Sequence, residues 1–376
     1  MKLLLLAPAS AIHTQRWVEA LHGRGVQLVL ATQHDPASWR APMGVKVARL
    51  PHCGTAGYFR NVPALRRLLR DERPDLLNAH YASGYGTTAA LAGFRPWLLS
   101  VWGSDVYDFP YEGRLQGWLL RRNLRHADAV ASTSEAMARQ VRRLVPDLGP
   151  VAVTPFGIDT DRFVPQPQRQ RQPQPHSGIV IGTVKTLAPK YGIDLLLRAF
   201  AQLRLTADPS AALSLVIVGD GPQRVELEAL SQALGIAAHV RFVGAVPHAE
   251  VPQWLNRFDL YVAASRLDSE SFGVAVLEAS ACGLPVVVSD VGGLPEVVVQ
   301  GETGSVVPRE DVAALAQAIQ RLIAAPELRR RFGAAGRERV LAHYGWPHSI
   351  DAMLRCFDEV VVRHAQRPAA SAGAVR

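Results

Sequence analysis

The chain has 376 residues, of which 48% are apolar and 20% are charged, and its formal net charge is +8. This length predicts two ordinary domains, and the apolar content is high enough to bury their cores, which excludes a disordered chain. The apolar run at the N-terminus is too short for a secretory leader, and no segment has the ~20 apolar residues of a membrane-spanning helix. Three isolated cysteines (Cys53, Cys282 and Cys356) argue against a disulfide framework, so a reducing cytoplasm is expected.

Positive charge is concentrated in the first half of the chain. Residues 1–164 hold 20 Lys and Arg against 13 Asp and Glu, whereas residues 165–376 hold 21 against 20. Such an excess suits an anionic lipid surface or a phosphorylated acceptor, and it equally suits arginine-rich solvated faces. A membrane-surface site would explain two arginine clusters. They are Arg60, Arg66, Arg67 and Arg70, and Arg114, Arg121, Arg122 and Arg125.

In chain order, the first half alternates short apolar runs with helical patterns, including a helix over Gln15–Gly23. The runs predicted to be strands are Lys2–Ala7, Val26–Ala31, Asp75–Tyr81, Trp97–Trp102 and Ala127–Ser132. This alternation indicates βαβ units and a parallel sheet. A Pro/Gln/Arg-rich segment follows, and we interpret residues 165–177 as an exposed interdomain linker.

The second half repeats the alternation, with helices predicted over Ile193–Leu205 and Pro222–Leu234. Its predicted strands are Ile179–Val184, Leu213–Gly219, Val240–Val243, Leu260–Ala263 and Pro285–Ser289. We therefore predict an α/β protein with two doubly wound, Rossmann-like domains, over residues 1–164 and 178–345, facing across a cleft. Ligands of such sheets bind outside the carboxyl ends of the strands. A last helix over 346–365 and a disordered tail over 366–376 complete the prediction.

The segment Ser269–Ser280 is the most informative part of the sequence, because it follows a strand and begins a helix near Ser271–Gly273. Unpartnered N–H groups and the positive end of the helix dipole bind phosphate there. If both were helical, Glu270 and Glu278 would lie ~12 Å apart along the helix axis, too far to share a proton. They suit a long ligand with hydroxyls at both ends and an anionic middle, such as a nucleotide sugar. The alternative, a solvated helix with two exposed glutamates, fits the apolar neighbours of Glu278 poorly.

Two lysines follow the first strand of the second half, Lys185 directly and Lys190 just before the next helix. Two ammonium groups beside a strand end can neutralise a diphosphate without a metal ion. A third feature, Ser289–Glu296, contains Gly292 and Gly293, which could line a cleft or simply form a tight turn.

These segments resemble the retaining nucleotide-sugar glycosyltransferases of family 4, which have the GT-B fold. The matching segments are Trp102–Asp105, Pro155–Asp159 with Phe163, Glu270–Glu278, Ala281–Glu296 and Gly301–Gly304. The resemblance implies that the second domain binds a nucleotide-diphosphate sugar, with UDP as the expected nucleotide. The first domain would bind a glycan or polyprenyl-pyrophosphate-linked acceptor of cell-surface polysaccharide synthesis. The last helix would cross back onto that domain, and the enzyme would work in the cytoplasm, in peripheral contact with the anionic inner face of the membrane.

The resemblance also implies roles for individual residues of the donor site. Glu270 would bind the hydroxyls of the transferred sugar, Glu278 those of the ribose, and Lys185 and Lys190 the departing diphosphate. The expected catalytic residues are Glu270, Lys185 and Lys190, and the other expected donor-binding positions are Gly182, Phe272, Gly273, Val274 and Glu278. Transfer would retain the anomeric configuration, with the leaving phosphate oxygen taking the acceptor proton and with no metal ion or other cofactor.

Three positions depart from the family pattern. The family often has Arg where Lys185 stands and His where Trp102 stands, and its glycine-rich turn after the first strand is here Pro8–Ala11. His13 and His80 are candidate substitutes for the missing histidine. The first-domain candidates for the acceptor or the cleft are His13, His80, Trp102 and Asp105.

Three other interpretations compete with the glycosyltransferase. Gly84, Gly86 and Ala89 match a dinucleotide-binding fingerprint, with Asp105 at the end of the next strand, which would suit an NAD-dependent oxidoreductase. An inactive nucleotide-sugar-binding protein is the second alternative. The D-x-D sequence Asp159–Asp161, a metal motif elsewhere, follows a turn here, and we interpret it as a coincidence. The 7% aromatic content, with no aromatic and basic stripe, predicts no nucleic-acid partner.

Overall fold

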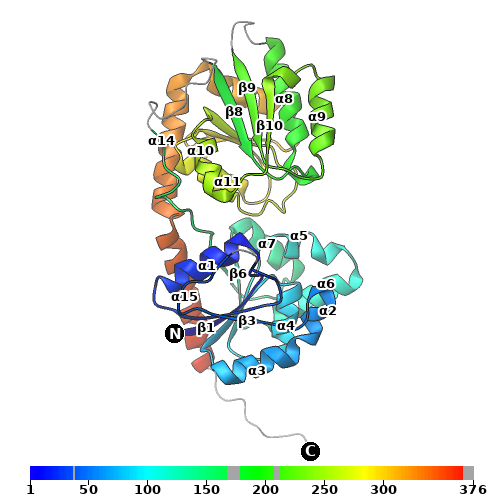
Figure 1. Ribbon diagram of the computed structural model, residues 1–376, viewed down its shortest axis with the longest axis vertical. Coiled ribbons are helices and arrows are strands. Elements are labelled where there is room, and N and C mark those ends of the chain that lie inside the picture. Colours follow the sequence, from blue (N-terminus) through cyan, green and yellow to red (C-terminus); the bar gives the residue numbers. More distant parts are fainter. Residues whose placement is uncertain (37–38, 167–177, 207–211, 367–376) are drawn as a thin grey trace, which may run out of the picture. The chain divides into compact units, whose positions relative to one another are not determined.

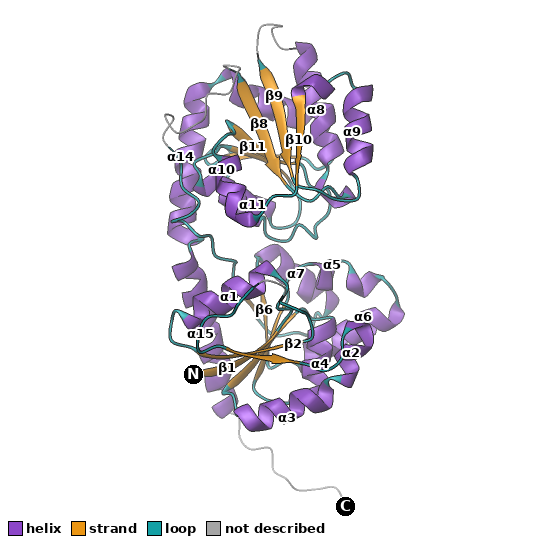
Figure 2. Cartoon of the chain, viewed as in Figure 1, coloured by secondary structure: helices purple, strands orange, loops and turns teal. Residues whose placement is uncertain are grey.

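The computed structural model describes residues 1–36, 39–166, 178–206 and 212–366, so the expected tail and most of the expected linker lie outside the described residues. The chain divides into two compact units. Unit 1 comprises Met1–Phe156 with Ser349–Arg376, and unit 2 comprises Gly157–His348. In each unit a parallel sheet is flanked by helices (Figures 1 and 2).

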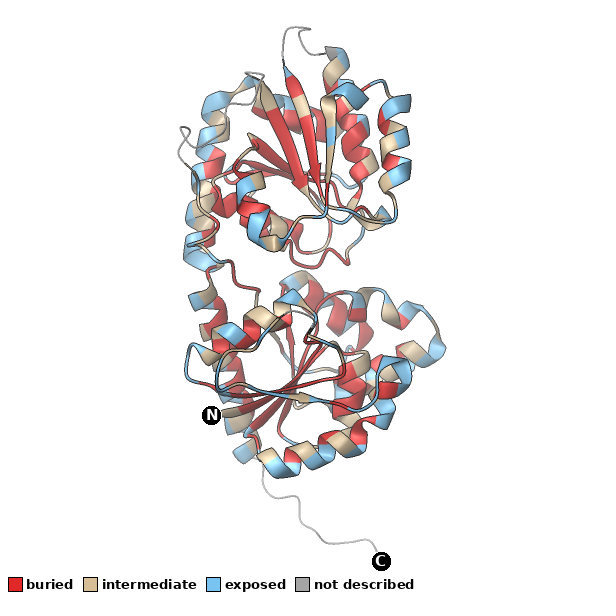
Figure 3. Ribbon diagram, viewed as in Figure 1, coloured by how far each residue is buried: buried red, intermediate tan, exposed pale blue. Residues whose placement is uncertain are grey.

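The sheet of unit 1 has seven described strands in the order β3-β2-β1-β4-β5-β6-β7, and all neighbours are parallel. The strands are β1 (Lys2–Leu6), β2 (Gln27–Thr32), β3 (Lys46–Arg49), β4 (Leu76–His80), β5 (Trp97–Ser100), β6 (Ala129–Ser132) and β7 (Val151–Val153). The helices are α1 (Ile12–His22), α2 (Gly54–Arg60), α3 (Val62–Glu72), α4 (Gly84–Ala92), α5 (Ser104–Tyr107), the 3₁₀ helix η1 (Phe109–Tyr111), α6 (Arg114–His126), α7 (Glu135–Leu144) and, from Ser349 onward, α15 (Trp346–Ala365). Leu3–Leu6 are completely buried, as expected where helices cover both faces of a parallel sheet (Figure 3).

The sheet of unit 2 has six described strands in the order β10-β9-β8-β11-β12-β13, again all parallel. The strands are β8 (Ile179–Val184), β9 (Leu213–Val218), β10 (Val240–Gly244), β11 (Leu260–Ala263), β12 (Val286–Ser289) and β13 (Gly304–Val307). The helices are η3 (Pro189–Tyr191), α8 (Ile193–Thr206), α9 (Arg224–Ala233), η4 (Ala237–His239), η5 (His248–Glu250), α10 (Val251–Leu255), α11 (Val274–Ala281), α12 (Leu294–Val297), α13 (Val312–Ala324) and α14 (Pro326–His343).

The prediction of an α/β protein with two doubly wound, Rossmann-like domains is confirmed. Each predicted strand is present, with ends shifted by two residues at most. The sequence analysis missed β3, β7 and β13, because each has only three or four residues and β3 reads Lys-Val-Ala-Arg on an exposed edge. In both sheets the strand order reverses beside the first strand, between β1 and β4 and between β8 and β11. Such switch points are where ligands of doubly wound sheets bind.

The division between the units falls at Phe156–Gly157, before the Pro/Gln/Arg-rich segment and eight residues before the predicted boundary at 164. Two backbone hydrogen bonds between distant parts of the chain explain this position. The Ile158 N–H donates to the Tyr344 carbonyl at 2.7 Å, and the Trp346 N–H donates to the Ile158 carbonyl at 3.3 Å. Residues that follow Gly157 are therefore tied to the end of unit 2.

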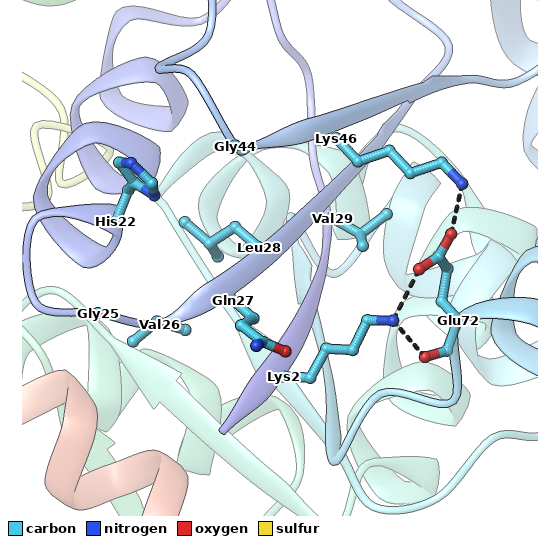
Figure 4. Close-up of a pocket in the computed structure, with 10 residues that line it drawn as sticks. All are labelled: Lys2, His22, Gly25, Val26, Gln27, Leu28, Val29, Gly44, Lys46 and Glu72. Atoms are coloured by element: carbon cyan, nitrogen blue, oxygen red, sulfur yellow. Dashed lines mark hydrogen bonds and ion pairs between the residues drawn. The ribbon is translucent and has the colours of Figure 1, made fainter.

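An ion-pair network joins the amino ends of β1 and β3 to the end of α3 in unit 1 (Figure 4). Lys2 Nζ donates to Glu72 Oε2 at 2.8 Å and to the Glu72 carbonyl at 2.6 Å, and Lys46 Nζ pairs with Glu72 Oε1. These hydrogen bonds to Lys2 and then Lys46 hold the pKa of the Glu72 carboxyl below its usual value. Ionised Glu72 therefore stabilises the folded chain.

We predict that Glu72→Gln lowers the unfolding free energy by about 1 kcal/mol at pH 7. The folded-state pKa of Glu72 is depressed, so its contribution is present above the unfolded pKa and is lost as pH falls through the folded pKa. The melting temperatures of the two proteins should thus converge as pH falls below about 4. Thermal unfolding from pH 7 to pH 3 measures this, and a difference that persists undiminished at pH 3 would contradict it.

Candidate functional site

The loops that follow β8 and β11 meet at the carboxyl edge of unit 2, at the switch point of its sheet. They carry most of the donor positions expected from the sequence. The Arg266 N–H donates to the Lys190 carbonyl at 2.8 Å, so the two loops are joined through their backbones.

Lys185 and Glu270 form the central contact of this site. Lys185 Nζ lies 2.7 Å from Glu270 Oε1, and the two side chains are only 8% and 9% exposed. Because the pair is buried in a low-dielectric environment, the attraction between the charges is strong. Removing one partner would leave the other charge buried and uncompensated. The structure therefore brings together one predicted phosphate ligand and the predicted sugar ligand.

Lys190 lies close to the same pair. Its ammonium is 4.8 Å from the centre of the Tyr191 ring, and the ammonium of Lys185 is 5.0 Å from that centre. The ring thus contacts both cations, and cation–π attraction favours each of these two contacts.

The loop before α11 is held in place by ion pairs and by two glycines. Arg266 pairs with Asp194 at 2.6 Å and with Glu310 at 3.1 Å. A Cβ on Gly292 would lie 2.2 Å from the Glu270 carbonyl oxygen, and one on Gly293 would lie 2.2 Å from that of Ser271. Only glycine permits this approach. It explains Gly292 and Gly293, which from the sequence could either line a cleft or form a tight turn.

Helix α11 begins at Val274, directly after the predicted start near Ser271–Gly273, with Gly273 as its N-cap at φ +94°. The carbonyl of Gly273 accepts from the N–H groups of Val276 and Leu277. The N–H groups of Gly273 and Val274 themselves donate to no other described residue. Phe272 is 5% exposed and packs edge-on against Tyr344, at 5.9 Å between ring centres. Two amides and a helix dipole are thus available for an anion at this point.

Glu278, on α11, is 4% exposed and has a partner that the sequence analysis missed. Its Oε1 lies 2.8 Å from His248 Nε2, at the start of η5, and the His248 ring lies 5.5 Å from that of Phe163. The available signal was the position of His248, four residues after the carboxyl end of β10. This contact orients the Glu278 carboxylate.

A cavity of about 350 Å³ lies at the carboxyl ends of β8, β9 and β10, beside Lys185. Its lining residues are mostly apolar: Val184, Lys185, Thr186, Tyr191, Val218, Gly219, Asp220, Ala245, Val246 and Val251. Gly219 lets the end of β9 approach the backbone of Lys185, because a Cβ there would lie 1.9 Å from the Lys185 carbonyl oxygen. Apolar walls with a cation at one side suit a flat ring system that carries phosphates.

Gly182 has a different role from the one expected. It lies inside β8, and a Cβ there would lie 2.0 Å from the Phe258 ring. Its lack of a side chain is thus required for core packing beneath the site.

The predicted acceptor residues of unit 1 form an aromatic cluster around Trp102. The ring centre of Trp102 lies 4.3 Å from that of His80 and 6.0 Å from that of His13, which stacks on Phe156 at 4.3 Å. His80 is 1% exposed, and burial lowers its pKa to about 3, so it is a neutral core residue at pH 7. His13 is only partly buried, so it is the more accessible of the two candidate histidines.

Asp105 is also structural, and its position corrects the predicted strand end. Strand β5 ends at Ser100, so Asp105 lies beyond it, in α5. Its carboxylate accepts from the N–H groups of Ala82, Trp102 and Gly103 at 2.7, 3.1 and 2.9 Å. Burial nevertheless raises its pKa. Asp105 therefore joins the loops after β4 and β5 and is not placed to bind a ribose.

The dinucleotide fingerprint has a packing explanation as well. A Cβ on Gly84 would lie 2.3 Å from the Tyr58 ring, and one on Gly86 would lie 3.1 Å from the Tyr81 carbonyl. Packing against Tyr58 and Tyr81 thus accounts for both glycines without a pyrophosphate.

The described part of the chain contains neither a cluster of metal-binding side chains nor a helix that could span a membrane. Across residues 1–36, 39–166, 178–206 and 212–366, no three His, Cys, Asp or Glu side chains are grouped so that they could hold a metal ion. Asp159 accepts from the Arg162 N–H at 3.1 Å, as a turn residue does. No helix described here combines the length and apolar character needed to cross a bilayer.

A second cavity, of about 390 Å³, lies at the amino ends of β1, β2 and β3, beside Lys2, Lys46 and Glu72 (Figure 4). It is at the opposite edge of the sheet from the switch point of unit 1, and its lysines are paired with Glu72. We therefore assign it no ligand.

Two family models match most of the chain. The model described as "Glycosyl transferases group 1" matches residues 166–339, and the one described as "Glycosyl transferase 4-like" matches residues 2–134. Among curated proteins, the GDP-mannose-dependent alpha-(1-6)-phosphatidylinositol monomannoside mannosyltransferase of Mycolicibacterium smegmatis is 34% identical over 278 residues, which is 69% of each chain.

Solved structures share the fold. Sucrose-phosphate synthase from Thermosynechococcus elongatus matches with a TM-score of 0.82 at 24% identity, over 96% of this chain and all of the other. HepE of Anabaena, in complex with UDP, matches with a TM-score of 0.79 at 19% identity, over 96% of this chain and all of the other.

We predict that Lys185 and Glu270 stabilise the folded chain as a coupled pair. Lys185→Met and Glu270→Gln should each lower the unfolding free energy, Lys185→Met by about 3 kcal/mol because it leaves a carboxylate buried alone. The double variant should lose less unfolding free energy than the sum of the two single losses, by about 1–3 kcal/mol. Denaturant unfolding without ligand measures this cycle, with Lys190→Met as the control. Strictly additive losses would contradict the coupling.

Proposed function

Because this chain belongs to the family 4 glycosyltransferases and has their GT-B fold, we propose that unit 2 binds a nucleotide-diphosphate sugar whose sugar passes to a glycan or lipid-linked acceptor with retention of configuration. The supporting observation is the buried ion pair of Lys185 and Glu270, beside the start of α11. An ammonium and a carboxylate in contact match a ligand that presents a diphosphate next to sugar hydroxyls.

The nucleoside would occupy the 350 Å³ cavity at the ends of β8, β9 and β10. Its apolar walls would stack on the base, and Glu278, oriented by His248, would accept hydrogen bonds from the ribose hydroxyls. The cavity, Lys185 and Glu270 would thus contact base, diphosphate and sugar in turn.

Catalysis would depend on the leaving group. Lys185, Lys190 and the amides of Phe272, Gly273 and Val274 would stabilise the negative charge that develops on the departing diphosphate. Because Lys185 is buried, its charge acts in a low-dielectric environment, where its effect on the transition state is larger than in water. The departing phosphate oxygen would take the acceptor proton on the same face of the sugar, so no strong protein base is required. His80 is too deeply buried to serve as one.

The donor proposed first is GDP-mannose, because the mycobacterial relative at 34% identity is named for it. The UDP sugar expected from the sequence stays a prediction, and UDP sugars are included in the donor screen described next. We further propose a lipid-linked acceptor at the inner face of the cytoplasmic membrane, in cell-surface glycan synthesis. The name of that relative, a phosphatidylinositol monomannoside mannosyltransferase, supports this choice of acceptor class.

A donor screen tests the proposal. At a concentration 100 times Kd, the true donor should stabilise the native chain by about 2.7 kcal/mol, which raises the melting temperature by several degrees. Glu278→Ala should abolish this rise for the same donor, because the ribose loses its acceptor. Glu338→Ala, an exposed glutamate on α14, is the matched control and should keep the rise. If neither GDP-mannose nor a UDP sugar shifts the wild type, the proposed function is wrong.

We also propose that transfer needs no metal ion, because two lysines and the helix start supply the positive charge. Excess chelator should leave the rate of sugar transfer unchanged. A loss of activity that added Mg²⁺ or Mn²⁺ restores would contradict this.

A further inference from the structure

A hydrogen-bond network surrounds the Tyr85 hydroxyl in unit 1, at the carboxyl end of β2. The hydroxyl accepts from the Gln33 N–H at 3.0 Å, and it lies 2.7 Å from His34 Nδ1 and 3.2 Å from Thr32 Oγ1. Tyr85, Thr32 and Gln33 are at most 3% exposed, whereas His34 is only partly buried. The imidazole of His34 is therefore the member of this network that a ligand could reach.

The hydrogen bonds of Thr32 fix the position of the proton on the His34 ring. Thr32 Oγ1 accepts from the N–H groups of Ala9 and His34, both at 3.1 Å, and donates to the His34 carbonyl at 3.3 Å. Thr32 thus has no lone pair left for the Tyr85 proton, which goes to the nearer partner, His34 Nδ1. Burial lowers the pKa of His34, so the ring is neutral at pH 7 and carries its own proton on Nε2.

The Nε2–H of His34 is an available hydrogen-bond donor. Among residues 1–36, 39–166, 178–206 and 212–366, it meets no acceptor. The next residue, Asp35, pairs with Arg49 at 3.1 Å, and the side chains of the network itself are uncharged. A single neutral donor suits a hydroxyl oxygen, whereas phosphate is bound by cationic side chains or by several amides.

Three loops at the carboxyl edge of the unit 1 sheet meet in this network. Thr32 ends β2, Ala9 lies in the loop after β1, and Tyr85 lies in the first turn of α4, which follows β4. Because the strand order reverses between β1 and β4, the network lies beside the switch point of this sheet. Ligands of doubly wound sheets bind at such points.

The backbone that carries His34 is also held from the side of α2. Gln33 Nε2 donates to the Gly54 carbonyl at 3.2 Å, and Gln33 Oε1 accepts from Asn61 Nδ2 at 3.1 Å. Asn61 Nδ2 donates to the His52 carbonyl at 2.7 Å as well. His34 is thus fixed in place before any ligand binds, so that binding costs little ordering of this loop.

Tyr81, which directly follows β4, has a strained backbone at the same edge. Its φ is +68°, a left-handed conformation that a bulky residue adopts only at a cost and that is concentrated at functional sites. Its N–H donates to the Ser100 carbonyl at 3.0 Å, and its carbonyl accepts from the Gly86 N–H at 2.9 Å. Tyr81 brings a partly buried aromatic ring to the switch point, and ligand sites combine such rings with a few placed polar groups.

We propose that His34 binds the acceptor of the proposed transfer by donating its Nε2–H to a hydroxyl oxygen of an uncharged, hydroxylated ring. Such a ring is either a glycan unit or the cyclitol of a lipid headgroup. Tyr85 is the positioning residue, because its hydroxyl holds the imidazole in the tautomer that donates from Nε2. The inference rests on the proposed function and adds a polar acceptor contact that the buried His80 and Asp105 do not supply.

Nitrogen-15 NMR of the histidine side chains in the full chain tests this inference. The probes are methyl α-mannoside, for a glycan unit, and myo-inositol, for a cyclitol, and the His34 signals are those that His34→Gln removes. We expect a protonated Nε2, an unprotonated Nδ1 and a shift of both signals as one probe is added, with a Kd of about 1–10 mM. Tyr85→Phe, which removes only the hydroxyl, should raise this Kd about fivefold. His22→Gln, from the amino edge of the same sheet, is the matched control and should leave it unchanged.

The probe that shifts the His34 signals identifies the source of the hydroxylated ring. A ring protonated on Nδ1, or His34 signals that neither probe moves, would refute the inference. If Tyr85→Phe does not fold, the tautomer and the titration of the wild type decide.

The outcomes also separate this inference from the proposed function. Donor-dependent thermal stabilisation should be unchanged in Tyr85→Phe and His22→Gln. If the wild type shows that stabilisation but neither probe moves His34, the inference is wrong and the proposed function stands. If no donor stabilises the wild type but a probe still shifts His34, the proposed function is wrong and the polyol contact stands.

Discussion

The contact between Lys185 and Glu270 is the interaction on which the proposed donor site of unit 2 depends. A buried ammonium and a buried carboxylate 2.7 Å apart are stable only as a pair, since either charge alone would be costly to desolvate. The pair in turn constrains the loops after β8 and β11, because both partners must reach the same point. Gly292, Gly293 and the Arg266 ion pairs hold the second loop where this contact is possible.

Much of the fold could be predicted because parallel strands buried on both faces appear as continuous apolar runs. Leu3–Leu6 and Val286–Ser289 are such runs. Strand β3 was missed because an exposed edge strand needs no apolar run. The unit boundary at Phe156–Gly157 was missed because it depends on hydrogen bonds from Ile158 to Tyr344, almost 190 residues later in the chain, which no local pattern indicates.

In the site, too, positions set by the local sequence could be predicted, whereas contacts between distant segments could not. That Glu270 and Lys185 lie at one edge of the sheet could be predicted from the sequence, because Lys185 follows β8 directly and Glu270 lies between β11 and the start of α11. His248 could not, since its role depends on meeting Glu278 from another element. The glycines carried the least information: Gly182, Gly84 and Gly86 resemble ligand-binding glycines, yet each makes room for a protein atom. Distinguishing the two uses of glycine requires coordinates.

Mutual neutralisation of Lys185 and Glu270 also affects which anions the site can admit. Under the proposed function, inorganic phosphate would have to draw the ammonium away while offering the carboxylate no hydrogen-bond donor. A sugar diphosphate would compensate both groups at once. The pair would therefore favour a ligand that carries both a diphosphate and hydroxyls over a small anion that carries negative charge alone.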